Sequence, residues 1–156
     1  MSIPAHQPQL EVDQSRAVAR LSTDYFLRAL RLMADVHEGE LITGIIFQAI
    51  IAANTSHLEQ TADGARHAGN DSVPPDELRK PVSVLGIAGA LGLPFETTRR
   101  HVNRLLASGR CKRVRGGVIV PQSALQTDVM SDAVRANLAN VKRFVRELKR
   151  AGVVLD

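Results

Sequence analysis

The residues whose side chains could do chemistry are concentrated in the stretch 95–115. Nine polar or basic residues form the candidate site: Glu96, Thr97, Arg99, Arg100, Asn103, Arg104, Lys112, Arg113 and Arg115. Between positions 99 and 115 the chain carries seven Arg or Lys residues and no Asp or Glu. Arg and Lys neutralise phosphates, and Thr, Asn and Arg can pair with base edges in the major groove. We therefore expect this stretch to bind double-stranded DNA.

The first six of these residues share a predicted helix over about 95–108. On a wheel of about 100° per residue, its apolar side falls within about 80°. That side comprises Thr98, Val102, Leu105 and Leu106. The polar candidates point the other way, with Arg99 and His101 at the flanks of the apolar side. The exposed face is therefore suited to lie in the major groove, which makes this the predicted recognition helix.

A shorter helix is predicted just before it. Leu85, Ala88, Leu91 and Gly92 recur at steps of three and four, so that they can face inward together. Gly92 is expected to end this helix, because glycine adopts the left-handed conformation of a helix terminus without strain. Pro94 suits the first turn of the next helix. A tight corner between two helices follows.

A hairpin is predicted after the recognition helix. Gly109 stops the helix, and residues 111–120 are expected to form two short strands with Gly116 and Gly117 at the turn. Three of the candidate site residues, Lys112, Arg113 and Arg115, belong to this hairpin. The order helix, corner, helix and basic hairpin predicts a winged helix-turn-helix over residues 82–121. The hairpin 111–120 would be the wing, which contacts the DNA backbone.

Residues 84–120 are similar to the winged helix-turn-helix of bacterial transcriptional regulators, most closely the GntR-like pattern. The similarity is carried by Ala88, Gly92, Thr97, Arg99, Arg100, Leu105, Gly109, Gly116 and Gly117, and it covers roughly a quarter of the chain. The sequence departs from the pattern at Thr98, where Val or Ile is usual, and at His101, where a small or aliphatic residue is common. The stretch also resembles short alphaproteobacterial regulators. The resemblance implies a bacterial, sequence-specific DNA-binding transcriptional regulator.

The N-terminal part of the chain predicts an arm, two helices and a loop. Residues 1–20 contain prolines and glutamines without periodicity and are expected to form a mobile arm. Residues 21–58 predict two helices, the first capped by Ser22 with Leu21 packing on Phe26. The second, over 40–57, is apolar nearly all round and is expected to pack under the winged helix. Residues 59–81 are rich in Gly, Asp, Asn and Pro and predict a flexible loop.

The C-terminal part, residues 122–156, predicts one long helix capped by Ser123. Its apolar residues alternate at steps of four and three: Val134, Leu138, Val141, Val145 and Leu148. This spacing is typical of the seam between two paired helices. We expect this helix to form the interface of a homodimer, to which the helix 26–36 also contributes, because helix-turn-helix regulators read paired half-sites. The alternative is packing within one chain.

The composition limits location and partners. The chain has 156 residues, a net charge of +4 and a single cysteine, Cys111, so no internal disulfide can form and a cytoplasmic location is expected. We expect Cys111 to pack inside the wing; a redox role would need its pKa lowered by Arg110, Lys112 and Arg113. The apolar stretch 41–53 is too short to span a bilayer, so no membrane partner is predicted.

The motifs of common enzyme classes are incomplete. Gly86, Gly89 and Gly92 are spaced by three and do not form the dinucleotide-binding pattern. His37 and Glu38 begin a zinc-protease motif, but position 41 is Leu where the second histidine belongs. We therefore predict no enzymatic activity, no catalytic residue, no cofactor and no metal site.

Two other functions remain open at this point. The basic face could belong to a winged-helix interaction module that binds an acidic protein or RNA, or to an architectural protein that binds DNA without sequence preference. Exposed Thr97, Arg100 and Asn103 favour base reading over both. The predicted fold is mainly α with a small β wing, flanked by N-terminal and C-terminal helices. A small-molecule effector cannot be identified from these patterns.

Overall fold

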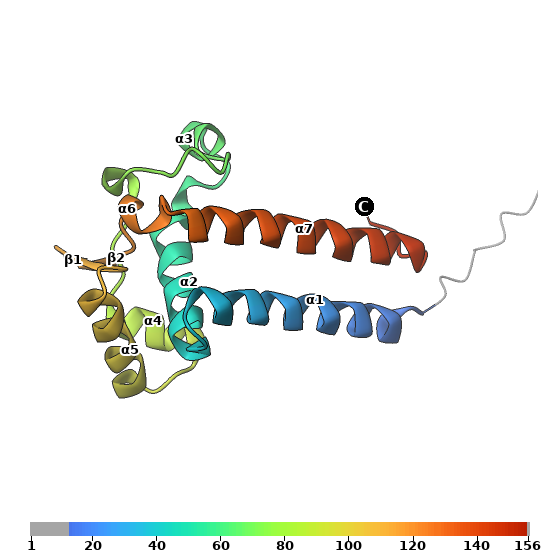
Figure 1. The fold of residues 1–156 in the computed structure, drawn as a ribbon, viewed down its shortest axis with the longest axis horizontal. Helices are drawn as coiled ribbons and strands as arrows, with labels where there is room; N and C mark the ends of the chain where they lie inside the picture. Colours follow the sequence, from blue (N-terminus) through green and yellow to red (C-terminus); the bar gives the residue numbers. More distant parts are fainter. Residues whose placement is uncertain (1–12, 156) are drawn as a thin grey trace, which may run out of the picture.

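The computed structural model describes residues 13–155. In chain order the elements are α1 (Ser15–Val36), α2 (Leu41–Thr55), η1 (Ser56–Leu58), α3 (Ala62–Arg66), η2 (Asp76–Leu78), α4 (Val84–Leu91), α5 (Phe95–Ala107), β1 (Lys112–Val114), β2 (Gly117–Ile119), α6 (Gln122–Leu125) and α7 (Asp128–Arg150). The described part of the protein is mainly helical with a small two-stranded antiparallel sheet, as predicted. Figure 1 shows a body built around α2 and a long arm made of α1 and α7.

The core of the body is organised around α2. Ile46, Phe47 and Ile50 of this helix are fully buried. The other buried members of the core come from α4, α5 and the hairpin: Ile87, Val102, Leu105, Cys111, Val118 and Val120. The apolar residues of α2 lie nearly all round the helix, so several of its sides can be buried against neighbouring elements. This agrees with the prediction of a central helix.

A sharp corner joins α4 to α5. Ser83 caps α4 by accepting a hydrogen bond from the Gly86 N–H (3.0 Å), and Gly92 ends the helix in the left-handed conformation with φ 64°. Pro94 then precedes the first turn of α5. The prediction for the inward face of α4 was wrong at Leu85, which is 69% exposed, while Ile87 is buried in its place. Since α4 is apolar on most sides, periodicity could not decide which side meets α2.

The hairpin pairs β1 and β2 in the register Lys112 with Ile119 and Val114 with Gly117. Gly116 occupies the turn with φ 96°, but Gly117, predicted in the turn, begins β2. Val82 hydrogen-bonds to Val118 in both directions, at 2.9 and 3.1 Å. A Cβ at Gly117 would lie 2.2 Å from the Val82 carbonyl oxygen, so glycine is needed for this close approach.

The arm consists of α1 and α7, which run antiparallel and project away from the body (Figure 1). The rings of Tyr25 and Phe144 stack at a centroid distance of 5.0 Å, and Asn140 Nδ2 donates to the Tyr25 carbonyl (3.2 Å). Near the free end, Gln14 Nε2 donates to the Ala151 carbonyl (2.9 Å). Of the described residues in the two helices, Leu148 alone is buried. Pairing within one chain thus leaves several large apolar side chains of the arm exposed, among them Phe26, Leu27, Val134 and Leu138.

The start of α1 corrects the prediction for the N-terminus. The helix begins at Ser15, so Ser22 lies inside it and is no cap, and Phe26 is 57% exposed instead of packing on Leu21. Residues 15–20 are helical and not a mobile arm, because α7 provides the packing partner that this weakly periodic segment lacks in the sequence. The remainder of the predicted arm, 1–12, lies outside the described residues.

Two further predictions about connections were wrong. Ser123 belongs to the short helix α6, and α7 begins only after Thr127, whose hydroxyl accepts from the Met130 N–H (3.2 Å). The segment 59–81, predicted as a flexible loop, contains α3 and η2. It is tied to α7 by Asn70 Nδ2, which donates to Ser131 Oγ (2.9 Å). Tertiary hydrogen bonds of this kind leave no local pattern in the sequence.

Candidate nucleic-acid interface

α5 carries the predicted division into two faces. Thr98, Val102 and Leu105 are buried, and the opposite side exposes Glu96, Arg99, Arg100, Asn103 and Arg104. Thr97 is half-buried. Thr98 Oγ1 donates to the Pro94 carbonyl (3.0 Å), which satisfies its hydroxyl in a position where an aliphatic residue is usual.

His101 fixes the orientation of α5 on α2. Its Nδ1 lies 2.8 Å from Thr43 Oγ1, and the two atoms share a hydrogen bond. Desolvation and the nearby Arg104 lower the pKa of His101, which favours the neutral ring that this contact accommodates. His101 therefore has a structural role at the flank of the helix.

Several basic side chains of the stretch 99–115 are engaged within the chain. The contacts are Arg99 Nε to Glu96 (2.9 Å), Arg104 Nη1 to Glu40 (3.4 Å), Lys112 Nζ to Asp76 (4.0 Å) and Arg110 Nη1 to His37 Nδ1 (2.7 Å). The hydrogen bond from Arg99 lowers the pKa of Glu96. Because exposed ion pairs are weak, a phosphate can replace the carboxylates beside Arg99, Arg104 and Lys112. Arg110 is half-buried, and its hydrogen bond to His37 makes it less available to a phosphate.

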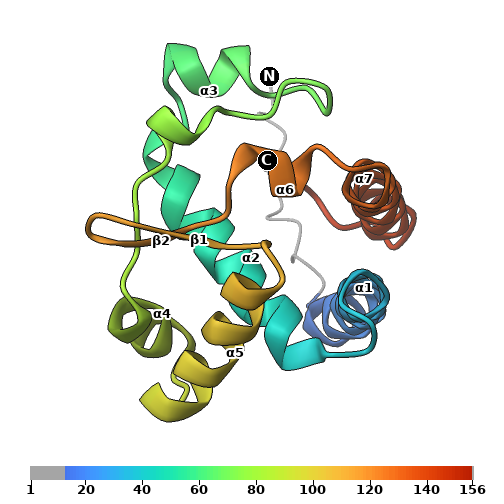
Figure 2. The ribbon, with the colours of Figure 1, turned by 60° about the vertical axis from the view of Figure 1, so that its left-hand side comes forward.

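The remaining three arginines are differently placed. Arg100, Arg113 and Arg115 are exposed, and no carboxylate among residues 13–155 lies within ion-pair distance of them. Arg100 belongs to α5, and Arg113 and Arg115 belong to the hairpin and its turn. Figure 2 shows α4, α5 and the hairpin grouped around α2, and Figure 1 shows this group at the end of the molecule opposite the tip of the arm. The fold thus presents cationic side chains from two elements at one end.

Glu40 and Asp76 were missed by the sequence analysis. Glu40 is 64 residues from Arg104 in the chain, and Asp76 reaches Lys112 from η2. No spacing rule connects acids and bases that far apart. Both lie beside candidate site residues, so they tune the positive charge of this end of the protein.

Cys111 is buried, and burial raises the pKa of its thiol to about 12. The thiolate is the reactive form of cysteine, and it is suppressed here despite the neighbouring cations. Burial therefore argues against a redox-sensitive Cys111. The residue packs in the core just before β1, together with residues of α2 and α5, and not within the hairpin alone.

His37 is a buried histidine held in its neutral form. Desolvation, followed by the charge of Arg110, lowers its pKa from 6.5 to about 4. Its Nδ1 accepts the hydrogen bond from Arg110, and its ring meets Phe47 edge-on at 4.9 Å. Protonation would remove the acceptor and place two positive charges together.

We expect His37 to make folding pH-dependent between pH about 6.5 and about 4. In this window the unfolded chain binds a proton that the folded chain does not, so the free energy of unfolding falls as the pH falls, by on the order of 2 kcal/mol. His37→Gln keeps an acceptor for Arg110 and does not titrate. Urea unfolding at both ends of this pH window should therefore show a smaller decrease in the free energy of unfolding for the variant than for the wild type. Equal losses would show that His37 does not carry this dependence.

Comparison with protein-family models, with curated proteins and with solved structures gave no match for this chain. Its function is therefore inferred from geometry. Among the described residues, Leu41–Leu58 has a mean hydropathy of 1.4 and the length of a membrane span. The packing of α2 at the centre of the body accounts for the same composition, since a buried core helix is equally apolar.

Proposed function

We propose that this protein is a sequence-specific transcriptional regulator that binds double-stranded DNA through a winged helix-turn-helix. The observation that carries the proposal is that an exposed polar helix face and a basic hairpin lie together at one end of the fold. One is α5, with Val102 and Leu105 buried and Arg100 and Asn103 exposed. The other is the hairpin that follows directly and carries Arg113 and Arg115. The resemblance to GntR-like bacterial regulators, and with it a cytoplasmic location, belongs to the same proposal.

The proposed docking places α5 in the major groove. Its 13 residues span about 20 Å, which suits the groove of B-form DNA. Arg100 can pair with the edge of a guanine and Asn103 with that of an adenine. The hairpin then contacts phosphates or the minor groove through Arg113 and Arg115.

The arm supplies the proposed dimer contact. Phe26 and Leu27 of α1 and Val134 and Leu138 of α7 are exposed apolar side chains. Two helices that fully bury few side chains between them are poorly stable alone, whereas the arms of two subunits can form a four-helix bundle. A symmetric pair would also present two copies of α5 to paired half-sites. We therefore propose a homodimer joined through α1 and α7.

The experiment that tests base reading compares Arg100→Ala with Arg113→Ala. We expect Arg100→Ala to weaken binding to the preferred site by about 1–3 kcal/mol and to relax the choice at one base pair. Arg113→Ala should weaken all duplexes alike and reduce the salt slope by about one per subunit. The measurement is competition between a site selected from random DNA and a scrambled duplex.

The outcome for Arg100→Ala decides between the candidate functions. An equal loss on the selected and scrambled duplexes would mean that Arg100 reads no base, which favours an architectural protein. Failure of the wild type to select any site would have the same meaning. Stronger binding to RNA or to an acidic protein than to duplex DNA would favour an interaction module.

A further inference from the structure

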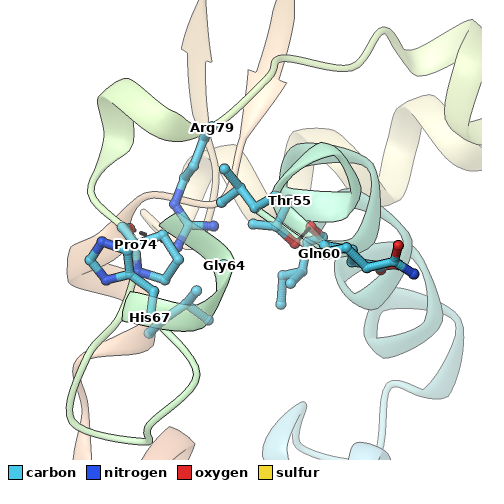
Figure 3. A pocket seen from close by; sticks show the side chains of 10 residues that line it. Thr55, Gln60, Gly64, His67, Pro74 and Arg79 are labelled. Carbon is cyan, nitrogen blue, oxygen red and sulfur yellow. Dashed lines mark hydrogen bonds between the residues drawn. The ribbon is translucent and has the colours of Figure 1, made fainter. Parts of the chain in front are cut away.

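A cavity of about 440 Å³ lies on the side of α2 that faces α3 and α6 (Figure 3). Its apolar wall comes from Ile51, Leu58, Pro74 and Leu125. A volume of this size accommodates a small organic molecule, and a mostly apolar lining with few polar groups is typical of ligand sites. The cavity involves the segment 59–81 and lies apart from the residues proposed to contact DNA.

Arg79 is the buried charged residue that lines this cavity. It is 6% exposed, and its side chain reaches down toward Pro74, whose carbonyl accepts from Nη2 (3.0 Å) (Figure 3). Its Nε and Nη1 have no hydrogen-bond partner among the described residues. Burial lowers the pKa of Arg79, although the guanidinium stays charged because its ordinary pKa is so high. A buried cation with unused donors is unfavourable unless an anion meets it.

The acids nearest to the cavity compensate Arg79 only in part. Against the larger effect of burial, the charge of Asp76 raises the pKa of Arg79, but Asp76 forms no ion pair with it. Asp76 accepts from the Gln122 N–H (2.7 Å) and lies 4.0 Å from Lys112. Asp63 of α3 pairs with Arg66 (3.0 Å). Glu59 lies at the exposed rim and, within residues 13–155, forms no ion pair with Arg79. In the part of the chain that the structure describes, the positive charge of Arg79 is thus only partly balanced, and no carboxylate forms an ion pair with it.

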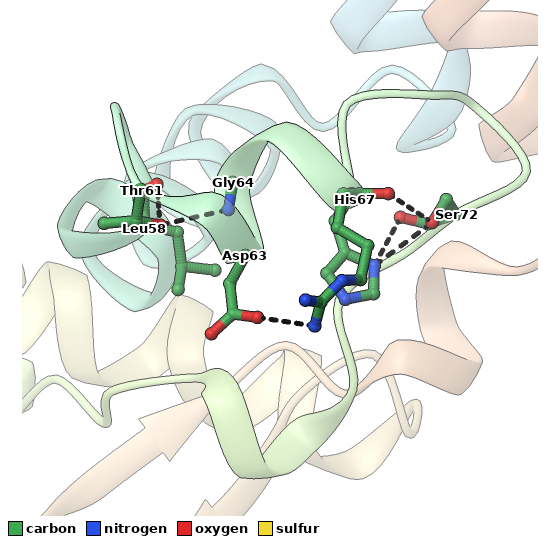
Figure 4. Close-up of polar contacts among 7 residues, drawn as sticks. Leu58, Thr61, Asp63, Gly64, His67 and Ser72 are labelled. Carbon is green, nitrogen blue, oxygen red and sulfur yellow. Dashed lines mark hydrogen bonds and ion pairs between the residues drawn. The ribbon is translucent and has the colours of Figure 1, made fainter.

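The wall formed by α3 is held in place by its own polar contacts (Figure 4). Thr61 Oγ1 accepts from the Gly64 N–H (3.0 Å), and His67 Nδ1 lies 3.1 Å from Ser72 Oγ. A Cβ at Gly64 would lie 2.1 Å from the Leu58 carbonyl oxygen, so only glycine lets α3 close against η1. The cavity is therefore built by specific contacts and is no loose gap beside a loop.

We propose that this cavity binds a small amphipathic monocarboxylate. The carboxylate lies against the guanidinium of Arg79, which lines the cavity, and the apolar body of the molecule packs on Ile51, Leu58 and Leu125. A charge-assisted hydrogen bond in a partly desolvated site is strong enough to anchor a small ligand. The inference goes beyond the proposed function, and the binding step requires no DNA.

The site is connected to the hairpin through one buried amide. Asn54 of α2 donates from Nδ2 to the carbonyls of Lys80 (2.7 Å) and Val118 (3.3 Å), and its Oδ1 accepts from the Val120 N–H (2.9 Å). Lys80 follows Arg79 directly in the chain. A ligand that moves Arg79 therefore acts on the segment that positions β2, and any resulting change in DNA affinity would be matched by an equal change in ligand affinity.

The test is a titration of the full chain with benzoate and, separately, with uncharged benzamide, followed by amide chemical shifts. We expect saturable benzoate binding with a dissociation constant of about 1 mM or tighter, since the probe has few atoms. Benzamide should bind at least about tenfold more weakly. The shifts should be largest at Thr55, Leu58 and Lys80. Inorganic phosphate is a third probe, and preferential phosphate binding would overturn the carboxylate assignment.

Arg79→Gln should reduce benzoate affinity about tenfold to a hundredfold, because it removes the charged donors. Arg66→Gln is the matched control, since it removes one positive charge from exposed α3 beside the cavity and should leave binding unchanged. Leu125→Phe, which narrows the cavity without changing charge, should also weaken binding. Leu125→Phe still tests the proposal if Arg79→Gln does not fold.

Three results would overturn the proposal. One is the failure of benzoate, phenylacetate and octanoate alike to bind saturably at about 10 mM. Another is equal binding of benzoate and benzamide. The third is an equal loss in Arg66→Gln and Arg79→Gln, which would indicate general attraction to a basic protein. None of these results bears on DNA binding, so the two proposals fail separately.

Discussion

Affinity for duplex DNA should fall by about 10⁵ between 50 mM and 200 mM salt if the protein binds as a dimer. Beside the base contact proposed for Arg100, the exposed basic residues of this end offer up to five phosphate contacts per subunit: Arg99, Arg104, Lys112, Arg113 and Arg115. If about five are made, a dimer releases counterions from about ten phosphates, and log K changes with log salt at a slope of roughly −9. Fluorescence anisotropy at several salt concentrations measures this slope.

A triple variant gives this prediction a matched control. Replacing Arg100, Arg113 and Arg115 together with Ala should flatten the slope by about four in a dimer, because two phosphate contacts are lost in each subunit. The same substitution at Arg16, Arg20 and Arg31, exposed residues of α1, removes equal charge from the arm and should change the slope little. A wild-type slope near zero would refute the proposed DNA interface. Equal effects of the two triple variants would show that net charge alone drives binding.

Leu138→Asp should raise the dissociation constant of the dimer by about a thousandfold or more, because each subunit would bury a charge at the interface. Leu138 is 53% exposed in one chain, so the free monomer leaves the carboxylate in water and its unfolding free energy should change by less than about 1 kcal/mol. Sedimentation velocity measures the association, and urea unfolding measures the stability.

Ala139→Asp is the control for the dimer prediction. Ala139 is the exposed neighbour of Leu138 on α7, lies outside the seam, and takes the same new charge. We expect this variant to associate like the wild type. A wild type that stays monomeric at micromolar concentration would contradict the proposed dimer, as would equal weakening by the two substitutions.

The local rules of helices and turns predicted much of the body. The buried side of α5 followed from the spacing of Thr98, Val102 and Leu105, because a helix turns by a constant angle per residue. The end of α4 at Gly92 followed from the ability of glycine to adopt positive φ. The central place of α2 followed from its lack of a polar side. In each case the cause acts within a few residues along the chain.

The same rules failed where several arrangements satisfied them. α4 is apolar on most sides, and only its contact with α2 decided that Ile87 and not Leu85 is buried. The segment 15–20 shows weak periodicity, and packing on α7 made it helical. The apolar seam of α7 was visible in the sequence. The part of this seam that is covered within one chain is decided by packing against α1. Leu148 is buried, and Leu138 stays exposed.

The sequence by itself determined the types of residue on the exposed side of α5 and the positions of its ends. The tertiary structure alone decided which basic residues are engaged, because Glu40, Asp76 and His37 reach their partners across long stretches of chain. It also decided that Arg79, one arginine in a polar segment, is buried beside a cavity with unused donors. The physical reason is that charge pairing and desolvation depend on distances in space, which no spacing along the chain encodes.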